Sequence, residues 1–203
     1  MDVAEVAEVR EVVAEMGRLL ERLQGLTTPL EGQRPFWVFP VGTAGAPVAE
    51  WYCAQYHTFD GKAGHTGLDL NLDRAPWGDV DRGQPVYAVT AGVVESVGFS
   101  ESWRGVAVLR VEHEGAPLWV RYAHLEREPV MVDAGQEVSA GYLLGRLGDY
   151  QRGAGGDHLH FDMALDAFGW NYWLTPGIRW VDPVRVLRAH LPAEWVEAML
   201  ARG

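Results

Sequence analysis

The stretch VAVLRVEHEGAPLWVRYAH, residues 106–124, contains two apolar segments separated by a short polar turn. Val106–His113 and Pro117–His124 are both rich in β-branched and aromatic side chains, which favour strands. Glu114-Gly115 lies between them, and glycine readily adopts the positive φ that a two-residue hairpin turn requires. The stretch therefore predicts two neighbouring antiparallel strands joined by a tight turn.

The residues around this hairpin continue the β pattern. Pro85–Val97 has a similar composition, and the segments 81–88 (DRGQPVYA) and 133–140 (DAGQEVSA) share Asp, Gly, Gln, Val and Ala. Each segment runs into a glycine-containing apolar stretch, Gly92–Gly98 in one case and Gly141–Gly148 in the other. A solenoid needs at least three repeats, so this single pair predicts two similar turn-and-strand units in one compact antiparallel sheet or barrel. We expect a mainly β domain over residues 35–203.

Helical periodicity is confined to the two ends of the chain. In residues 1–28 apolar side chains recur three and four positions apart, the spacing of a coiled coil. This seam consists of Val6, Val9, Val13, Met16, Leu20 and Leu23. We expect an amphipathic helix that packs on its own domain, forms a weak homodimer or docks on a protein partner. Pro183–Leu200 predicts a C-terminal helix.

Composition excludes several classes of protein. The 203 residues include 17 Lys+Arg and 28 Asp+Glu, a net charge of −11, which predicts repulsion from nucleic acids and from anionic membrane surfaces. No apolar run approaches the roughly 20 residues of a membrane span. A single cysteine, Cys53, excludes a disulfide framework and a cysteine-rich zinc module within these residues.

The segment GHTGLD, residues 64–69, contains the first candidate site residues, His65 and Asp69. In a straight strand these two residues would lie about 13 Å apart, too far to share a metal ion. Gly64 and Gly67 can adopt backbone angles that fold the chain back, so we expect them to bring the two side chains together.

Two further segments carry histidines in unusual settings. His158 and His160 flank Leu159, and alternate residues of a strand point to the same face, so both imidazoles can converge on one site. His124 lies at the end of the apolar strand that contains Tyr122.

These histidines and Asp69 together indicate a metal-dependent catalytic site. Catalytic zinc usually takes three nitrogen or oxygen ligands and leaves the fourth position to water. Two histidines and one carboxylate would suffice, and two histidines would remain for proton transfer. The other histidines, His57, His113 and His190, lack such settings, and we expect structural roles for them.

Three motifs together resemble the signature of the lysostaphin-like (LytM-type) zinc metalloendopeptidases: HTGLD at 65–69, YAHL at 122–125 and HLHF at 158–161. The resemblance covers about residues 40–163. It implies a largely antiparallel β domain with a groove, one Zn²⁺, and hydrolysis of peptide bonds in the stem peptides or cross-bridges of bacterial peptidoglycan. It also implies that zinc is bound by His65, Asp69 and His160, and that His124 and His158 are catalytic.

The chain departs from this family at two places. Gly148–Asp157 lacks the short Asn/Ser-Thr-Gly-rich loop that commonly precedes the last motif, and Asp162 stands where the family often has glutamate. Both changes bear on the substrate more than on the chemistry. Trp170, Trp173 and Trp180 follow the last motif. We expect them to form an aromatic core under the C-terminal helix, with a lip of the groove as the alternative.

Three other functions fit parts of the sequence. Two histidines and a carboxylate can hold Fe(II) in an oxygenase, but His124 and His158 would then have no role. A biotinyl or lipoyl carrier needs a lysine at the tip of a hairpin, whereas Lys62, the only lysine, precedes His65. The main alternative is a non-catalytic wall-binding or partner-activating module of the same fold. Such a module would be expected to lose ligands that this chain keeps.

The expected location follows from the expected substrate. Peptidoglycan lies outside the cytoplasmic membrane, so we expect an extracytoplasmic protein, either of the cell envelope or secreted, or a phage lysin. Residues 1–26 carry regularly spaced acidic residues instead of a basic region followed by an apolar stretch, so no signal peptide is predicted there.

Overall fold

The computed structural model describes residues 36–42, 51–53, 65–72, 80–127, 130–149, 157–171 and 177–201. The helix predicted for residues 1–28 lies outside these ranges, as do His57, Lys62, Gly64 and Trp173. Within the described ranges, no helix has the length and apolar character needed to cross a membrane.

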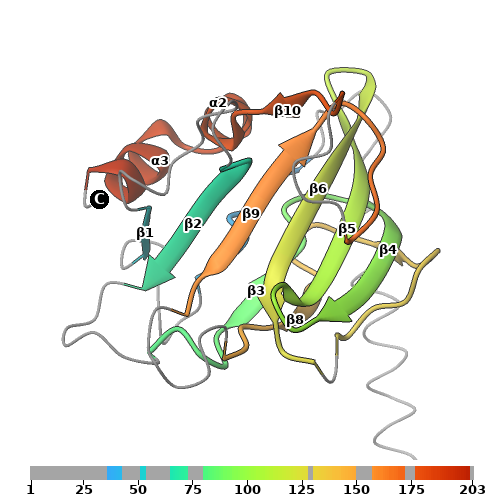
Figure 1. Cartoon of the computed structure of the whole chain (residues 1–203). Helices are drawn as coiled ribbons and strands as arrows, with labels where there is room; N and C mark the ends of the chain where they lie inside the picture. Colours follow the sequence, from blue (N-terminus) through green and yellow to red (C-terminus); the bar gives the residue numbers. More distant parts are fainter. Residues whose placement is uncertain are drawn as a thin grey trace, which may run out of the picture. The chain divides into compact units, whose positions relative to one another are not determined.

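Antiparallel strands dominate the described residues, which confirms the predicted mainly β fold (Figure 1). The main sheet has eight strands, and every pairing in it is antiparallel. Its order is β1 (Trp51–Cys53), β2 (Gly67–Leu72), β9 (Leu159–Ala164), β6 (Ala116–Leu125), β5 (Arg104–His113), β4 (Gly92–Ser100) and β7 (Glu137–Val138). A short strand, β10 (Trp180–Val181), also pairs with β9.

The predicted hairpin is confirmed as β5 and β6. His113 pairs with Ala116, so only two residues form the turn. Their φ angles are 52° at Glu114 and 78° at Gly115. Positive φ at both central positions is the geometry of a type I′ turn, whose twist matches that of the flanking strands.

The two repeated segments form equivalent units, and the strands of one unit pair with the strands of the other. In both copies the glutamine N–H donates to the aspartate carbonyl, at 3.0 Å in the first and 3.1 Å in the second, and the intervening glycine has positive φ. Strand β3 (Pro85–Tyr87) of the first unit pairs with β8 (Leu143–Arg146) of the second. Strand β4 of the first unit pairs in turn with β7 of the second. The predicted pair of turn-and-strand units is present, and each unit supplies the partner strand of the other.

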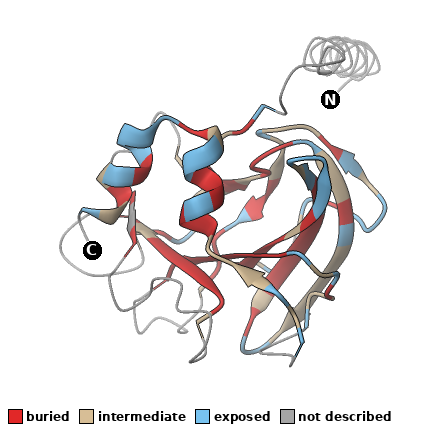
Figure 2. Cartoon of the chain, turned by 90° about the horizontal axis from the view of Figure 1, so that it is seen from above, coloured by how far each residue is buried: buried red, intermediate tan, exposed pale blue. Residues whose placement is uncertain are grey.

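Alternate residues of the central strands build the main core. In β5, Ala107, Leu109 and Val111 belong to this core, whereas Val106 and Val108 belong to a separate cluster on the other face of the sheet. The main core also contains apolar side chains of the C-terminal helices, and Figure 2 shows that both helices have a buried and an exposed face. The helices therefore cover one face of the main sheet.

The helical segment predicted for Pro183–Leu200 is divided into α2 (Pro183–His190) and α3 (Ala193–Leu200). Pro192 separates them, because proline disfavours helical geometry in the residue before it. Leu191 accordingly has an extended backbone, with φ −109° and ψ 158°. The Asp182 carboxylate accepts a hydrogen bond from the Val184 N–H at 2.9 Å and caps α2.

The other face of the sheet carries an aromatic cluster. Trp170 and Trp180 pack against a group of buried residues that comprises Trp103, Val106, Val108, Ala123, Ala164 and Phe168. The expectation that these tryptophans lie under the C-terminal helix is therefore wrong: they lie on the opposite face of the sheet. Gly98 makes room for them, since a Cβ at that position would lie 2.6 Å from Trp170 Nε1.

Candidate active site

Strands β2 and β9 bring the first candidate residues together. Asp69 of β2 lies directly opposite His160 of β9, and Asp69 Oδ1 is 3.0 Å from His160 Nδ1. His65 precedes β2, and its Nε2 is also 3.0 Å from Asp69 Oδ1. Asp69 and His160 are buried, while His65 is partly exposed. The pairing of two strands thus assembles one carboxylate and two imidazoles that lie far apart in the sequence.

Gly67 has a role different from the expected one. It is an extended residue within β2, so the expectation that it folds the chain back is wrong. A Cβ at this position would lie only 2.5 Å from the Cβ of Asp162. The missing side chain therefore allows β2 to approach β9 closely. His65 and Thr66 precede β2, and Gly64, the other glycine of this expectation, lies outside the described residues.

The spacing of the donor atoms fits a small tetrahedral cation. The ligand atoms of His65, Asp69 and His160 all lie within 4.8 Å of one another. Two ligands that bind zinc at about 2.0–2.1 Å in tetrahedral geometry lie about 3.3 Å apart. The observed nitrogen–oxygen separations of 3.0 Å are close to this value. Two imidazoles, one carboxylate and this spacing form a donor set that zinc accepts.

A β-bulge places His124 beside these donors. Gly105 and Ala107 of β5 pair with Leu125 and Tyr122 of β6, so β6 contains one extra residue between them. His124 has φ 66°, which is uncommon for a residue other than glycine. Both features turn its ring away from the main core. A bulge of this kind can redirect a functional side chain.

Trp103 fixes the orientation of the His124 ring. The two rings stack with centroids 5.7 Å apart, and His124 Nδ1 lies 3.2 Å from the Trp103 carbonyl oxygen. A carbonyl can only accept, so Nδ1 carries the proton, and Nε2 of the neutral ring is a proton acceptor. Trp103 was not among the candidate residues in the sequence, and it lies in the turn between β4 and β5.

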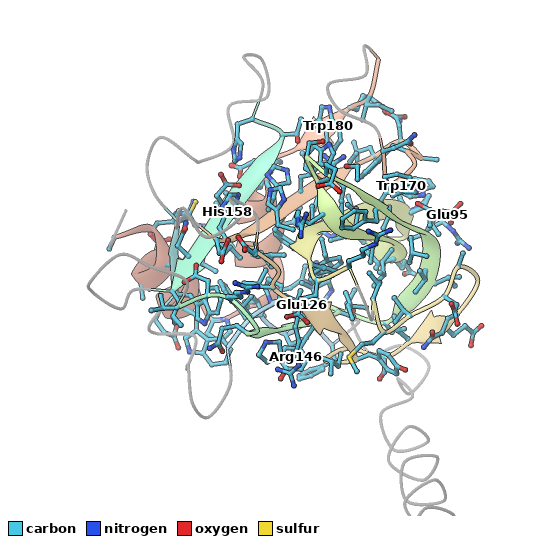
Figure 3. The ribbon with its side chains drawn as sticks, turned by 60° about the horizontal axis from the view of Figure 1, so that its bottom comes forward. Glu95, Glu126, Arg146, His158, Trp170 and Trp180 are labelled. Carbon is cyan, nitrogen blue, oxygen red and sulfur yellow. The ribbon has the colours of Figure 1, made fainter. Side chains whose placement is uncertain are left out.

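His158 completes the group. It immediately precedes β9 (Figure 3), and its Nε2 is 3.5 Å from Asp69 Oδ1. Its ring centroid lies 4.7 Å from that of His124. The structure therefore brings together all five residues that the sequence singled out as metal-binding or catalytic, from β2, β6, β9 and the residues just before β2 and β9.

Burial and hydrogen bonding set the charges in this group. Burial would raise the pKa of Asp69, but hydrogen bonds with His160 and His65 hold that pKa below its ordinary value. Burial, assisted by the charges of His158 and His160, lowers the pKa of His124 well below its ordinary value. At neutral pH Asp69 is therefore anionic and His124 neutral, the states required for cation binding and for proton acceptance.

A pair of buried carboxyl groups, Asp81 and Asp157, was not expected. Asp81 accepts a hydrogen bond from the Leu72 N–H at 3.2 Å. Burial, opposed by this hydrogen bond and assisted by the charge of Asp157, raises the pKa of Asp81 to about 7. Both carboxyl groups are almost fully buried. Asp81 was visible in the sequence only as part of the repeated turn.

Two of the remaining histidines form a separate structural pair. His113 Nδ1 lies 2.9 Å from His190 Nε2, which connects the end of β5 to the end of α2. The ring of Trp37 stacks on His190 with centroids 4.3 Å apart. This arrangement agrees with the structural role expected for both histidines.

Comparison with known proteins identifies a family. Residues 63–169, more than half of the chain, match the profile of Peptidase family M23. This segment includes all five candidate site residues. No curated protein sequence matches the chain significantly.

Several solved structures are similar in fold. A LytM protein from Ruminococcus gnavus is 23% identical, with a TM-score of 0.55, and the match covers 82% of this chain and 62% of that one. Csd3 from Helicobacter pylori is 19% identical, with a TM-score of 0.50 and coverage of 82% and 38%. Lysostaphin is 20% identical, with a TM-score of 0.48 and coverage of 77% and 51%. The chain thus spans less than two thirds of the length of each of these proteins.

Proposed function

The chain belongs to peptidase family M23, and from this membership and the His–Asp–His group we propose that it is a zinc-dependent endopeptidase acting on bacterial peptidoglycan. The bonds that it would hydrolyse are peptide bonds of the stem peptides or cross-bridges. The observation that carries the proposal is the convergence of His65, Asp69 and His160 from β2 and β9, with His124 and His158 beside them.

The proposed zinc ligands are His65, Asp69 and His160. Zinc bound by these residues would supply Lewis acidity at neutral pH, which activates water and polarises a scissile carbonyl. The anionic Asp69 would offset the charge of the cation. Its Oδ1 lies close to nitrogens of both His65 and His160, so the three donor atoms face one common position. Two of the three donors, Asp69 and His160, face each other across the paired strands β2 and β9, and His65 lies just before β2.

The proposed catalytic residues are His124 and His158. The neutral His124, protonated at Nδ1 by its hydrogen bond to the Trp103 carbonyl, can accept a proton at Nε2. His158 lies between His124 and Asp69, where it can donate a hydrogen bond to a developing negative charge. Removing a donor of this kind typically lowers the rate by about 10²–10³-fold.

We place the protein outside the cytoplasmic membrane, because its proposed substrate lies there. The alternative function is a wall-binding or partner-activating module of the same fold without catalysis. Retention of all five site residues favours the enzyme. We also propose that residues 35–203 form the catalytic domain and that the amphipathic segment 1–28 serves association.

The test combines digestion with metal analysis. Purified peptidoglycan is incubated with the full chain, and the soluble fragments are identified by mass spectrometry, while elemental analysis gives the zinc content. We expect one zinc per chain and release of peptides cut at one type of bond. His124→Ala and His158→Ala should keep zinc and lose hydrolysis, whereas His160→Ala should lose both.

His113→Ala is the matched control, because it removes a partly buried histidine far from the site. It should keep both zinc and hydrolysis. Iron in place of zinc, or zinc undiminished in Asp69→Ala, would contradict the metal assignment. Sedimentation with peptidoglycan without any released fragment would favour the binding module.

A further inference from the structure

A buried carboxylate lies behind the His–Asp–His group. Asp162 is fully buried in β9, two residues after His160 and on the same face of the strand. Its Oδ2 lies 3.1 Å from His160 Nε2 and accepts a hydrogen bond from Thr66 Oγ1 at 2.6 Å. Its Oδ1 accepts from Arg121 Nε at 3.1 Å, and Arg121 Nη2 donates to Oδ2. The two carboxylate oxygens together therefore have partners from three separate segments.

We infer that Asp162, held by Arg121, is a positioning residue that makes Nδ1 the metal-binding nitrogen of His160. The inference rests on the proposed zinc function but concerns residues outside the donor set. It assigns a purpose to the position where this chain carries aspartate and the resembling family often carries glutamate.

The orientation of the His160 ring carries the argument. Its Nδ1 faces Asp69 Oδ1 at 3.0 Å, and its Nε2 faces Asp162 Oδ2 at 3.1 Å. Both nitrogens face carboxylate oxygens, but Asp69 is itself a proposed zinc ligand, whereas Asp162 is held by Thr66 and Arg121 outside the donor set. A ligating neutral imidazole has one N–H, and Asp162 accepts it at Nε2, so the lone pair of Nδ1 faces the proposed zinc position beside Asp69. A carboxylate on the second nitrogen also increases the basicity of a ligating histidine.

Arg121 and Asp162 form an ion pair that is inaccessible to solvent. Nε and Nη2 of Arg121 donate to the two carboxylate oxygens, the bidentate geometry of a guanidinium–carboxylate pair. Arg121 is itself fully buried, and its guanidinium lies 4.4 Å from the centroid of the Trp103 ring. The same tryptophan orients His124, so one aromatic ring supports residues on both sides of the site.

Thr66 extends the arrangement to the other ligand segment. It adjoins His65, and its hydroxyl donates to the same Asp162 oxygen that faces His160. Asp162 therefore links the segment that carries His65 to the strand that carries His160. Without the carboxylate, the tautomer of His160 would no longer be fixed. The segment that carries His65 would also lose the hydrogen bond that Thr66 makes with Asp162.

The test measures zinc affinity and the tautomer of His160 in the full chain. Zinc dissociation constants are obtained by competition with a chromophoric chelator. Asp162→Asn should bind zinc about 10–100-fold more weakly, the usual loss when the partner of a ligating histidine is removed. Asp162→Glu, which keeps the charge, should recover most of this loss. In the zinc-loaded protein labelled with ¹⁵N-histidine, wild type should show a slowly exchanging Nε2–H of His160, and Asp162→Asn should lose it.

Asp166→Asn provides a matched control. Asp166 forms a bidentate pair with Arg179, with no histidine on the carboxylate, and the pair is exposed. This variant should bind zinc within twofold of wild type. Because Asp162→Asn leaves Arg121 buried without a counter-charge and could prevent folding, the double variant Arg121→Gln/Asp162→Asn removes both charges. It should fold and show the same loss of zinc affinity.

The outcomes separate this inference from the proposed function. A folded Asp162 variant that binds zinc within threefold of wild type, with the Nε2–H of His160 intact, overturns the positioning role, even if the variant is less stable. A wild-type chain that binds no zinc overturns both. Zinc binding and hydrolysis by wild type, with unchanged affinity in the double variant, overturns the inference alone.

Discussion

Gly67→Ala tests the close approach of β2 and β9 on which the proposed site depends. The substitution adds one methyl group and changes no donor atom. A Cβ at this position would lie 2.5 Å from Asp162 Cβ and closer still to the Phe161 carbonyl oxygen. These are atoms of the neighbouring strand, which cannot move aside by a change of rotamer.

The required displacement is larger than a metal site tolerates. Cβ atoms essentially never approach another heavy atom more closely than 3.0 Å, so the two strands must separate by at least about 0.5 Å. Ligand distances in metal sites are fixed to about 0.2 Å. Gly67 pairs with Asp162, and Asp69 pairs with His160 two residues further along, so the displacement falls on the ligands. We expect zinc affinity to fall at least tenfold and the free energy of unfolding to fall by about 1–3 kcal/mol, as in overpacked cores.

Gly145→Ala is the control, because Gly145 is also an extended strand residue and its nearest neighbour would lie 3.4 Å from the new methyl. Urea unfolding and chelator competition are measured for both variants and for wild type. The control should lie within about 0.5 kcal/mol of wild type with unchanged zinc affinity. Equal stability and equal zinc affinity in the two variants would refute the reasoning.

Three further predictions concern other parts of the chain. Tyr122→Phe should lower the free energy of unfolding by about 1–3 kcal/mol in urea, because it leaves the buried Val89 N–H without the hydroxyl that accepts from it at 3.0 Å; a loss below about 0.5 kcal/mol would contradict this. The pKa of Asp81, raised to about 7, exceeds its unfolded value of about 4, so its contribution to stability is greatest below pH 4 and is lost as the pH rises through 7. Asp81→Asn should therefore gain stability relative to wild type between pH 5 and 8, and a difference that does not change with pH would exclude this. Removal of residues 1–28 should leave zinc content and hydrolysis of soluble muropeptides unchanged and abolish any concentration-dependent association in light scattering; a truncated chain that fails to fold would show that the segment belongs to the domain.

Local signals in the sequence were sufficient for part of the fold. The hairpin of β5 and β6 depends on two-residue turn chemistry and on flanking β-branched residues, and both are contiguous in the chain. The repeated turns were visible because each fixes the same Asp–Gly–Gln geometry. The pairing of strands between the two repeats was not predictable, since β3 pairs with β8 about 60 residues away and no local preference selects that partner.

The candidate site shows a similar division. His65, Asp69, His158 and His160 were found because each lies within a short motif. The reason given for Gly67 was wrong, because glycine serves both for unusual backbone angles and for close approach, and only the position of β9 distinguishes the two. The bulge at His124 left no distinct mark in the sequence, since it depends on a one-residue difference between two paired strands.

The residues behind the site did have a signal, although it lies on two strands. In β9 the polar residues His160 and Asp162 alternate with Leu159, Phe161 and Met163, which ordinarily indicates one buried and one solvent-exposed face. Here every residue of the strand is buried. Two polar side chains on a covered face need partners, and Arg121, the only charged residue of β6, lies opposite Asp162 in the pairing of the two strands. Oppositely charged residues that lie opposite each other in two buried strands are therefore best treated as a buried pair. In this chain such a pair leads directly to the nitrogen through which His160 would bind zinc.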